Sequence, residues 1–324
     1  MRWGIGGPGG IAARMAAALA DLDDAEVVAV GSRSAERAAA FAERFSIAHA
    51  HDSYAELCAD PDVDIVYVAA PHSVHRDLTV GALEAGKHVL CEKAFAVNAA
   101  QARQMVGTAE RTGRFLMEAM WTWFLPPIVE VKRRVLAGAI GEVRVVQADF
   151  AISVPGDVGR HRELALAGGA LLDLGIYPVA LARLILGEPT EVRALGHLGP
   201  TGVDANLAAV LSYDDDALAV FHTGLDARSS LTAQIVGTDG IIRIDAPFWC
   251  PSGFTLDRHD GAPERVEISH TGLAHEAAHA MARIADGHLE SDVIPLATSV
   301  SMMETLDEIR RQVGLVYPAD EASA

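Results

Sequence analysis

The chain carries a glycine-rich turn near its N-terminus whose spacing suits phosphate binding. It reads Gly7-Pro8-Gly9-Gly10-Ile11-Ala12, so glycine or alanine stands at each fixed position of a Gly-x-Gly-x-x-Gly/Ala pattern. An apolar run precedes the turn and an Ala-rich run follows it, which is the strand-turn-helix setting that the pattern requires. Glycines let the backbone approach a pyrophosphate, which then lies against the free N–H groups of the helix. The turn predicts dinucleotide contacts from residues 7–11, and an ordinary glycine-rich turn is the alternative.

The end of the second apolar run bears on the choice of dinucleotide. A carboxylate commonly stands there to bind the ribose hydroxyls of NAD, but this chain has Gly31-Ser32-Arg33. The Ser32 hydroxyl and the Arg33 guanidinium suit a 2′-phosphate. They favour NADP(H) over NAD(H), unless Arg33 is only a solvated residue at a helix start.

A zinc-protease pattern occurs near the C-terminus, where residues 275–279 read His-Glu-Ala-Ala-His. On a helix, the two histidines could bind zinc beside a glutamate base, and Glu304 or Glu308 could supply a third ligand. The longer metzincin pattern fails because Ala282 and Ala285 replace its glycine and third histidine. A zinc hydrolase is therefore a minor alternative.

His49 and His51, with Asp52, also look like metal ligands on paper. No further ligand stands nearby in the sequence, and a helix is predicted to follow. We interpret these residues as a polar loop and expect no metal in the functional site.

The helices and strands that must position these residues are predicted from two different patterns of apolar residues along the chain. Residues 1–119 alternate short apolar runs with longer amphipathic runs, as in a parallel sheet whose strands alternate with helices. Strands are predicted over 2–6, 26–31, 64–70, 88–91 and 114–118. Helices are predicted over 11–20, 35–45, 74–85 and 99–112, with Ser34 and Asn98 as N-caps. The pattern indicates an α/β, doubly wound Rossmann domain over residues 1–119.

Residues 120–324 have a different pattern. Helices are predicted over 127–138 and 170–186, and a helical tail over 273–313 with a break near Asp286-Gly287. Strands are predicted over 142–152, 191–197, 206–213, 217–223, 230–237 and 241–245. This indicates an α+β domain with a largely antiparallel open sheet, for substrate binding and oligomerisation.

Length, charge and cysteine content exclude several classes of protein. The 324 residues exceed what one core usually holds, and half of them are hydrophobic, so two globular domains are expected. With 26 Lys and Arg against 44 Asp and Glu, the net charge of −18 argues against nucleic acid or membrane partners. Cys58, Cys91 and Cys250 have neither disulfide nor metal-ligand spacing. No signal-peptide or transmembrane stretch is visible, so we expect a cytoplasmic protein that binds a small-molecule substrate.

Five segments together resemble the glucose-fructose oxidoreductase, inositol dehydrogenase and MocA (Gfo/Idh/MocA) family. They are Trp3-Gly4-Ile5, Gly31-Ser32-Arg33, Glu92-Lys93, residues 117–122 (Met-Glu-Ala-Met-Trp-Thr) and residues 169–177 (Gly-Ala-Leu-Leu-Asp-Leu-Gly-Ile-Tyr). They are most similar to the branch of dimeric dihydrodiol dehydrogenase and 1,5-anhydrofructose reductase. The resemblance implies an NAD(P)-dependent dehydrogenase or reductase acting on a CH–OH group of a sugar, cyclitol or dihydrodiol-like compound.

The resemblance also implies the catalytic residues. The family has a Glu-Lys-Pro motif and a helical Asp-x-x-x-Tyr or Asp-x-x-x-His pair, and Lys93, Asp173 and Tyr177 match these positions. Asp173 and Tyr177 are i, i+4 neighbours on a helix, and Lys93 ends a strand, so all three can point into one cleft. We expect Tyr177 to be the acid/base, Lys93 its electrostatic partner and a substrate contact, and Asp173 an orienting residue.

Further contacts are implied by the same resemblance. Besides the glycine turn, Ser32 and Arg33, cofactor contacts are expected from Ala70, Pro71, His72, His75, Glu92 and Lys93. Substrate contacts are expected from Trp121, Phe150 and Arg162.

Two positions depart from the family pattern. Ala94 stands where the family has proline in a peptide that is commonly cis, so either the cis bond is kept without proline or Lys93 is placed differently. Trp123 stands where the dihydrodiol-like pattern has arginine, so one polar substrate contact is missing.

The resemblance further implies a homodimer formed through the C-terminal sheet. Leu207, Ala209 and Leu211, with the apolar run 217–220, suggest more apolar surface than a monomer exposes. The rival function is a non-catalytic dinucleotide-binding regulator of the same fold.

Overall fold

A computed structural model describes residues 1–156 and 159–321, and contacts divide the chain into two units. The first comprises Met1–Trp121 and Thr271–Val300, and the second comprises Thr122–His270 and the described residues from Ser301 on. The sequence analysis placed 271–300 in its second domain. They group with the first unit, where α8 (Ala274–Ala285) packs on α1 (Gly10–Ala20). Periodicity identifies the apolar face of a helix but not the surface that this face covers.

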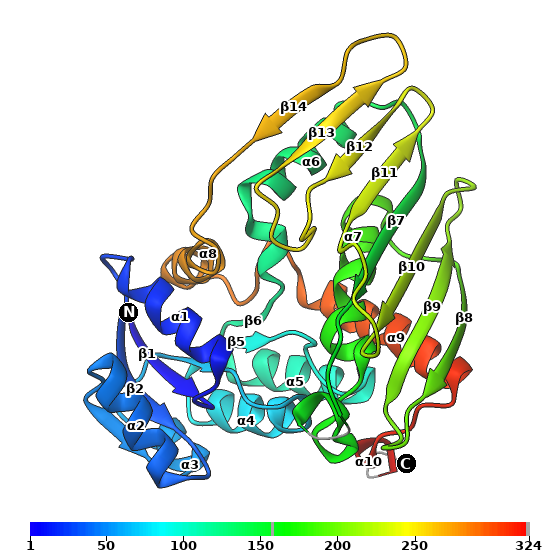
Figure 1. The fold of residues 1–324 in the computed structure, drawn as a ribbon. Helices are drawn as coiled ribbons and strands as arrows, with labels where there is room; N and C mark the ends of the chain where they lie inside the picture. Colours follow the sequence, from blue (N-terminus) through cyan, green and yellow to red (C-terminus); the bar gives the residue numbers. More distant parts are fainter. Residues whose placement is uncertain (157–158, 322–324) are drawn as a thin grey trace. The chain divides into compact units, whose positions relative to one another are not determined.

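The first unit is built on a six-stranded parallel sheet of order β3-β2-β1-β4-β5-β6 (Figure 1). Its strands are β1 (Arg2–Gly6), β2 (Glu26–Gly31), β3 (His49–His51), β4 (Ile65–Val68), β5 (His88–Glu92) and β6 (Leu116–Ala119). The helices between them are α1, α2 (Ala35–Phe45), α3 (Tyr54–Ala59), α4 (His72–Glu84) and α5 (Ala99–Thr112). Both predicted N-caps are confirmed, because Ser34 and Asn98 accept hydrogen bonds from backbone N–H groups three residues on.

The second unit is built on an eight-stranded sheet of order β14-β13-β12-β11-β7-β10-β9-β8, in which β7 and β10 form a parallel pair. Its strands are β7 (Val143–Ala151), β8 (Glu191–Leu198), β9 (Asp204–Ser212), β10 (Leu218–Gly224), β11 (Ala233–Gly237), β12 (Gly240–Ile244), β13 (Gly253–Arg258) and β14 (Glu264–Glu267). Its helices are α6 (Pro126–Leu136), α7 (Ile176–Leu186), most of α9 (Leu296–Val313) and α10 (Pro318–Glu321). The other described pairs are antiparallel. The predicted fold class, a Rossmann domain plus an α+β domain with a largely antiparallel sheet, is confirmed.

The helical stretch Leu164–Leu186 is long and apolar enough to cross a membrane, but 83% of its apolar window is buried inside the fold. It is a core segment of the second unit, where α7 packs on β7. The sequence predicted one helix over 170–186. In the structure a π-helical turn, Leu171–Gly175, comes first, and the α-helix α7 begins at Ile176.

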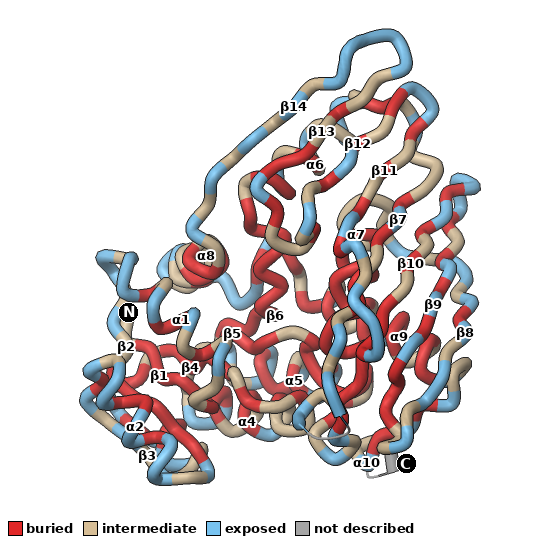
Figure 2. Tube along the Cα trace, viewed as in Figure 1, coloured by how far each residue is buried: buried red, intermediate tan, exposed pale blue. Residues whose placement is uncertain are grey.

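The two faces of the second sheet differ in exposure, and Figure 2 shows buried and exposed residues alternating along β9. Leu207, Ala209 and Leu211 are at most 2% exposed, so their use as evidence of exposed apolar surface was wrong. Alternation shows that one face is apolar but not that this face is uncovered. The exposed large apolar side chains on the described strands of this sheet are Val210 and Leu218, at 39% and 38%, and Leu195 and Leu198 of β8, at 84% and 41%.

Five short strands and α-helices of the described chain were missed by the sequence analysis, namely β3, α3, β13, β14 and α10. β3 contains His49 and His51, which were wrongly interpreted as a loop, and α3 follows it. A three-residue edge strand is too short for a periodic signal. β13 and β14 lie at one edge of the second sheet, and no residue of β14 is buried.

Candidate active site

The turn after β1 is shaped for a phosphate group. Gly7 has φ +103°, and a Cβ there would lie 2.9 Å from both the Ala69 carbonyl oxygen and Ala70 N, so only glycine fits. At Gly9 and Gly10 a Cβ would meet no atom within 4 Å, so the turn is open where α1 begins. Gly9 caps α1 without a side-chain hydrogen bond, so the first N–H groups of the helix can serve a ligand. These features fit the pyrophosphate of a dinucleotide.

Two guanidinium groups lie beyond the end of β2. Ser32 is buried and its Oγ accepts a backbone hydrogen bond at 3.1 Å, which leaves the hydroxyl hydrogen to donate. Burial raises the pKa of Tyr54, and the nearby guanidiniums of Arg33 and Arg37 partly offset this shift. Arg37 also donates to the Pro8 carbonyl at 3.3 Å and so ties α2 to the glycine turn. The sequence analysis identified Arg33 but missed Arg37, which lies one helical turn further on.

Lys93 directly follows β5, where its backbone is held by Glu92. The Glu92 carboxylate accepts hydrogen bonds from Lys93 N at 3.2 Å and from the Tyr67 hydroxyl. The peptide bond between Lys93 and Ala94 is cis, so the family geometry is present without proline.

His75, predicted to contact the cofactor, is enclosed instead. Its ring is 1% exposed, and its two nitrogens lie 2.9 Å from the carbonyl oxygens of Ala70 and Ala94. Burial lowers the pKa of His75 to about 4, so the neutral ring donates to one carbonyl at a time. His75 therefore joins the end of β4 to the segment after Lys93. The predicted contacts Pro71 and His72 lie beside it, at the start of α4.

Three buried carboxyl groups of the first unit interact electrostatically. Burial raises the pKa of Glu118 to about 7, although Phe95 N donates to its Oε1 at 3.1 Å. Burial, together with Glu92 and Glu118, raises the pKa of Glu276 well above its usual value, and Arg14 offsets only part of this. Among the described residues, neither oxygen of Glu276 has a hydrogen-bond partner, which fits a protonated carboxyl group. The sequence analysis missed this cluster because its members lie on β5, β6 and α8.

The burial of Glu276 contradicts the zinc-hydrolase alternative. A metalloprotease base must reach a metal-bound water, whereas Glu276 is 0% exposed. The His275 ring accepts a hydrogen bond from Thr271 N at 3.3 Å, and His279 Nε2 lies 2.8 Å from Ser291 Oγ. The pattern at 275–279 is therefore part of an ordinary helix of the first unit.

A buried carboxyl group fixes the start of the helical segment 171–186. Asp204 Oδ2 accepts a hydrogen bond from Leu171 N at 2.6 Å, and burial raises the pKa of Asp204 to about 7. Gly169 has φ +121°, and a Cβ there would lie 1.9 Å from Asp204 Oδ1. The Tyr317 hydroxyl closes the same turn by donating to the Gly168 carbonyl at 2.6 Å.

Asp173 and Tyr177 lie on this segment, one turn apart, and each is 7% exposed. Asp173 Oδ2 is 3.1 Å from the Arg160 guanidinium and 2.8 Å from His161 Nδ1. The Arg160 guanidinium donates a hydrogen bond to Asp173, and the His161 ring lies beside the same carboxylate oxygen.

Tyr177 lies against an aromatic group of Phe150, Phe248 and Trp249, in which Phe248 packs on the other two. The Tyr177 ring centroid lies 5.5 Å from that of Phe150 and 6.1 Å from that of Trp249. Phe150 and Trp249 stack at 3.5 Å with an interplanar angle of 8°. Phe150 was a predicted substrate contact, but Phe248 and Trp249 were missed because they stand on the loop after β12.

Three other residues singled out from the sequence have internal partners. Trp123 is buried and donates to the Ala180 carbonyl on α7 at 3.2 Å, so a packing residue replaces the family arginine. Arg162 donates to two backbone carbonyl oxygens and one carboxylate, which makes it a brace rather than a free substrate contact. Trp121 is 3% exposed, and the Arg14 guanidinium lies 5.2 Å from the centroid of its ring.

The remaining predicted site residues fall into one group in each unit. The glycine turn, Ser32, Arg33, Glu92 and Lys93 belong to the first unit, at the carboxyl ends of β1, β2 and β5. Asp173, Tyr177 and Phe150 belong to the second unit.

Two family models match the chain. The model described as "Oxidoreductase family, NAD-binding Rossmann fold" matches residues 1–120, and the GFO/IDH/MocA C-terminal domain matches residues 128–243.

Relatives and solved structures cover the chain almost completely. The trans-1,2-dihydrobenzene-1,2-diol dehydrogenase of Xenopus tropicalis is 37% identical over 98% of this chain and 99% of its own length. The human protein of that name is 37% identical over 99% of each chain. A 3-ketoreductase from Actinomadura kijaniata, solved with NADP and TDP-benzene, has TM-score 0.87, 29% identity and coverage of 97% and 98%. An aldose-aldose oxidoreductase from Caulobacter crescentus, complexed with glycerol, has TM-score 0.88, 26% identity and coverage of 97% of each chain.

Proposed function

Because the chain belongs to the Gfo/Idh/MocA family and is an NAD(P)-dependent dehydrogenase, we propose that it oxidises a secondary alcohol or reduces the matching carbonyl on a ring-shaped substrate. The substrate class is a sugar, a cyclitol or a dihydrodiol-like compound. One observation carries this proposal: Tyr177, with oriented Asp173 beside it, stands against the aromatic group.

Tyr177 is the acid/base in this proposal. When bound, the nicotinamide supplies the hydride acceptor or donor at its C4. In oxidation, Tyr177 takes the proton of the substrate O–H while the hydride leaves the carbon, so that a carbonyl remains. In reduction, Tyr177 returns a proton to the carbonyl oxygen. Asp173, which lies against Arg160 and His161, orients the Tyr177 hydroxyl in this proposal. The family resemblance assigns Lys93 as the positive charge that assists the same step.

The aromatic group supports the choice of substrate. Flat rings pack against the C–H face of a sugar or cyclitol ring and against a dihydrodiol ring alike. Such a wall also keeps water from the reacting atoms, which strengthens the electrostatic effect of each polar group. A small acyclic alcohol would leave this wall uncovered.

NADP(H) is the proposed cofactor. The support is the pair of guanidiniums of Arg33 and Arg37, with the Ser32 hydroxyl, where an NAD site commonly has a carboxylate. The structural neighbour from Actinomadura kijaniata was solved with NADP.

The experiment that tests this function is turnover by Tyr177→Phe on any polyol or keto-sugar that the wild type accepts. Loss of an acid/base should lower kcat about 10²- to 10⁴-fold while the affinity for NADPH, measured by fluorescence, stays unchanged. The matched control is Tyr213→Phe, a buried tyrosine at the end of β9, which should leave kcat unchanged. Unchanged turnover in Tyr177→Phe would overturn the assignment.

A further inference from the structure

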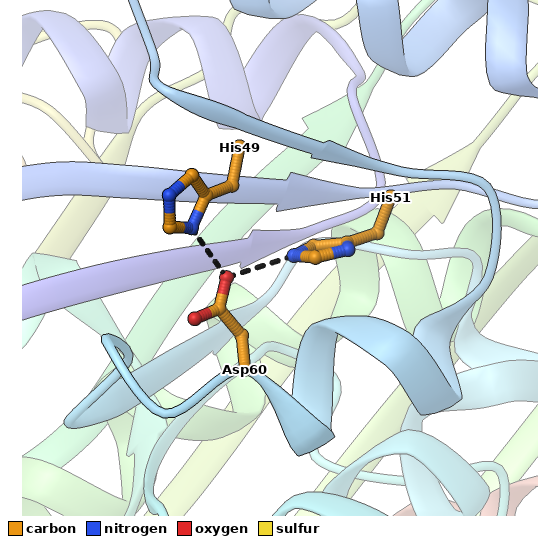
Figure 3. Close-up of side chains that lie close together, drawn as sticks. All are labelled: His49, His51 and Asp60. Carbon is orange, nitrogen blue, oxygen red and sulfur yellow. Dashed lines mark hydrogen bonds and ion pairs between the residues drawn. The ribbon is translucent and has the colours of Figure 1, made fainter.

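A cluster of two histidines and an aspartate lies at the edge of the Rossmann sheet. His49 Nδ1 is 2.7 Å and His51 Nε2 is 2.8 Å from the same oxygen, Asp60 Oδ2. Figure 3 shows the two rings converging on this oxygen. In the part of the chain that the structure describes, it is the one group of three such side chains whose ligand atoms lie within 4.8 Å of one another.

The backbone holds this arrangement in place. His49 and His51 are two residues apart on β3, so their side chains share one face, and β3 pairs with β2 through Ala29 and Gly31. The Asp60 side chain is 3% exposed, and its other oxygen accepts a hydrogen bond from Asp62 N at 2.9 Å. The hydrogen bond to Oδ1 therefore holds the carboxylate in place, and Oδ2 faces the two rings.

Among the described side chains, the Asp60 carboxylate is paired with the two imidazoles, which carry a positive charge only when protonated. Lys87 lies close, but its Nζ donates to the backbone carbonyls of Asp60 and Val63 at 2.7 and 2.8 Å. A buried anion faced by two imidazoles is a site where a divalent cation gains most.

We propose that His49, His51 and Asp60 bind a divalent transition-metal ion, and that this ion is zinc. Two imidazole nitrogens and one carboxylate oxygen are a common zinc ligand set, with a water in the fourth position. Binding requires each ring to carry its proton on the nitrogen that faces away from Asp60. For His51 that nitrogen, Nδ1, is 3.9 Å from Glu56 Oε2, which can accept the proton as an outer-shell carboxylate. The His49 side chain is 40% exposed, so the ion can enter from solvent and the ring can tilt toward it.

The site lies next to the cofactor-binding residues. The His51 carbonyl accepts a hydrogen bond from Ser32 N at 3.2 Å, and Gly31 pairs with His51. The ion would thus fix β3 beside the segment that carries Ser32 and Arg33. Zinc binding itself rests only on the three ligands and does not depend on the proposed function.

The test is calorimetric titration of zinc chloride into the untagged full-length protein after treatment with a chelator. We expect one zinc ion per chain with a Kd of micromolar or tighter. His49→Gln and His51→Gln should each weaken binding by at least about tenfold, and Glu56→Gln by about tenfold. The matched control, His275→Gln with His279→Gln, removes the other histidine pair and should bind zinc as the wild type does.

Cobalt(II) gives a second readout that needs no variant. The wild type should show the visible absorption of a four-coordinate cobalt site, and zinc should displace it. Absence of these bands, or zinc binding that survives both His49→Gln and His51→Gln, would overturn the proposal. Loss of binding in the 275 and 279 control with retention in His51→Gln would assign the ion to the other pair and overturn it equally.

Discussion

At the scale of single residues, the proposed preference for NADP(H) depends on the Arg33 guanidinium. A guanidinium-phosphate contact is a strong charge-assisted pair, so Arg33→Ala should weaken NADP(H) binding about 10- to 100-fold and leave NAD(H) binding nearly unchanged. Arg37→Ala should show the same selectivity. Calorimetry with both cofactors measures this, with Arg44→Ala at the far end of α2 as the control. An equal loss for both cofactors would show that the guanidinium does not contact the 2′-phosphate.

Glu118 makes the stability of the fold depend on pH. Its pKa is raised from 4.5 to about 7, so the folded chain binds this proton more tightly than the unfolded chain does. The stabilisation is complete below pH 4.5 and is lost as pH rises through about 7. Glu118→Gln should therefore be more stable than the wild type at pH 8.5, by about 2–3 kcal/mol at most, and not at pH 4.5.

Urea unfolding at the two pH values checks this expectation. Glu110→Gln, an exposed glutamate on α5, is the control and should change neither value. A wild type that gains stability between pH 4.5 and 8.5 relative to Glu118→Gln would contradict the assigned direction of the pKa shift.

At the scale of elements, the placement of the helical segment before α7 depends on residues far away in the sequence. Gly169→Ala would bring a Cβ to 1.9 Å from Asp204 Oδ1 at a positive φ. The free energy of unfolding should therefore fall by more than the about 1–3 kcal/mol that backbone strain alone costs. Turnover should fall as well, because the turn positions Asp173 and Tyr177. Gly187→Ala has φ +85° but meets no atom within 4 Å, so it separates strain from crowding. Equal losses of unfolding free energy and turnover in the two variants would contradict a role for Asp204.

The helical segment 171–186 shows which features of the fold and of the site could be predicted from the sequence. The glycine turn, both N-caps and the strand-helix order were predictable because each depends on residues a few positions apart. The contacts that place Tyr177 were not, because Leu171 meets Asp204 33 positions along and Gly168 meets Tyr317 149 positions along. The burial of Glu276 was equally unpredictable, because the same His-Glu-x-x-His pattern on a helix is compatible with a zinc site and with a helix packed against the core.

At the scale of the whole molecule, we propose a homodimer through the exposed face of the second sheet. Val210→Lys should weaken the dimer, since it places a charge on the apolar part of that face, where Val210 is 39% exposed. Leu136→Lys changes a more exposed leucine on α6, at 76%, and should leave assembly unchanged. Light scattering should give twice the chain mass of 34.2 kDa for the wild type. A wild-type monomer at micromolar concentration, or a dimer unaffected by Val210→Lys, would contradict this interface.

In the proposed function Tyr177 is the acid/base, and the family resemblance predicts that Lys93 shares its proton-transfer step. The most direct test is a double-mutant cycle of kcat/KM with Lys93→Met and Tyr177→Phe, on one substrate and with saturating NADP(H). If the two side chains act as one, the double variant should lose little more than the worse single variant, which is about 10²- to 10⁴-fold below the wild type. Losses that multiply, or a Tyr177→Phe variant as fast as the wild type, would show that the two residues do not share the proton-transfer step.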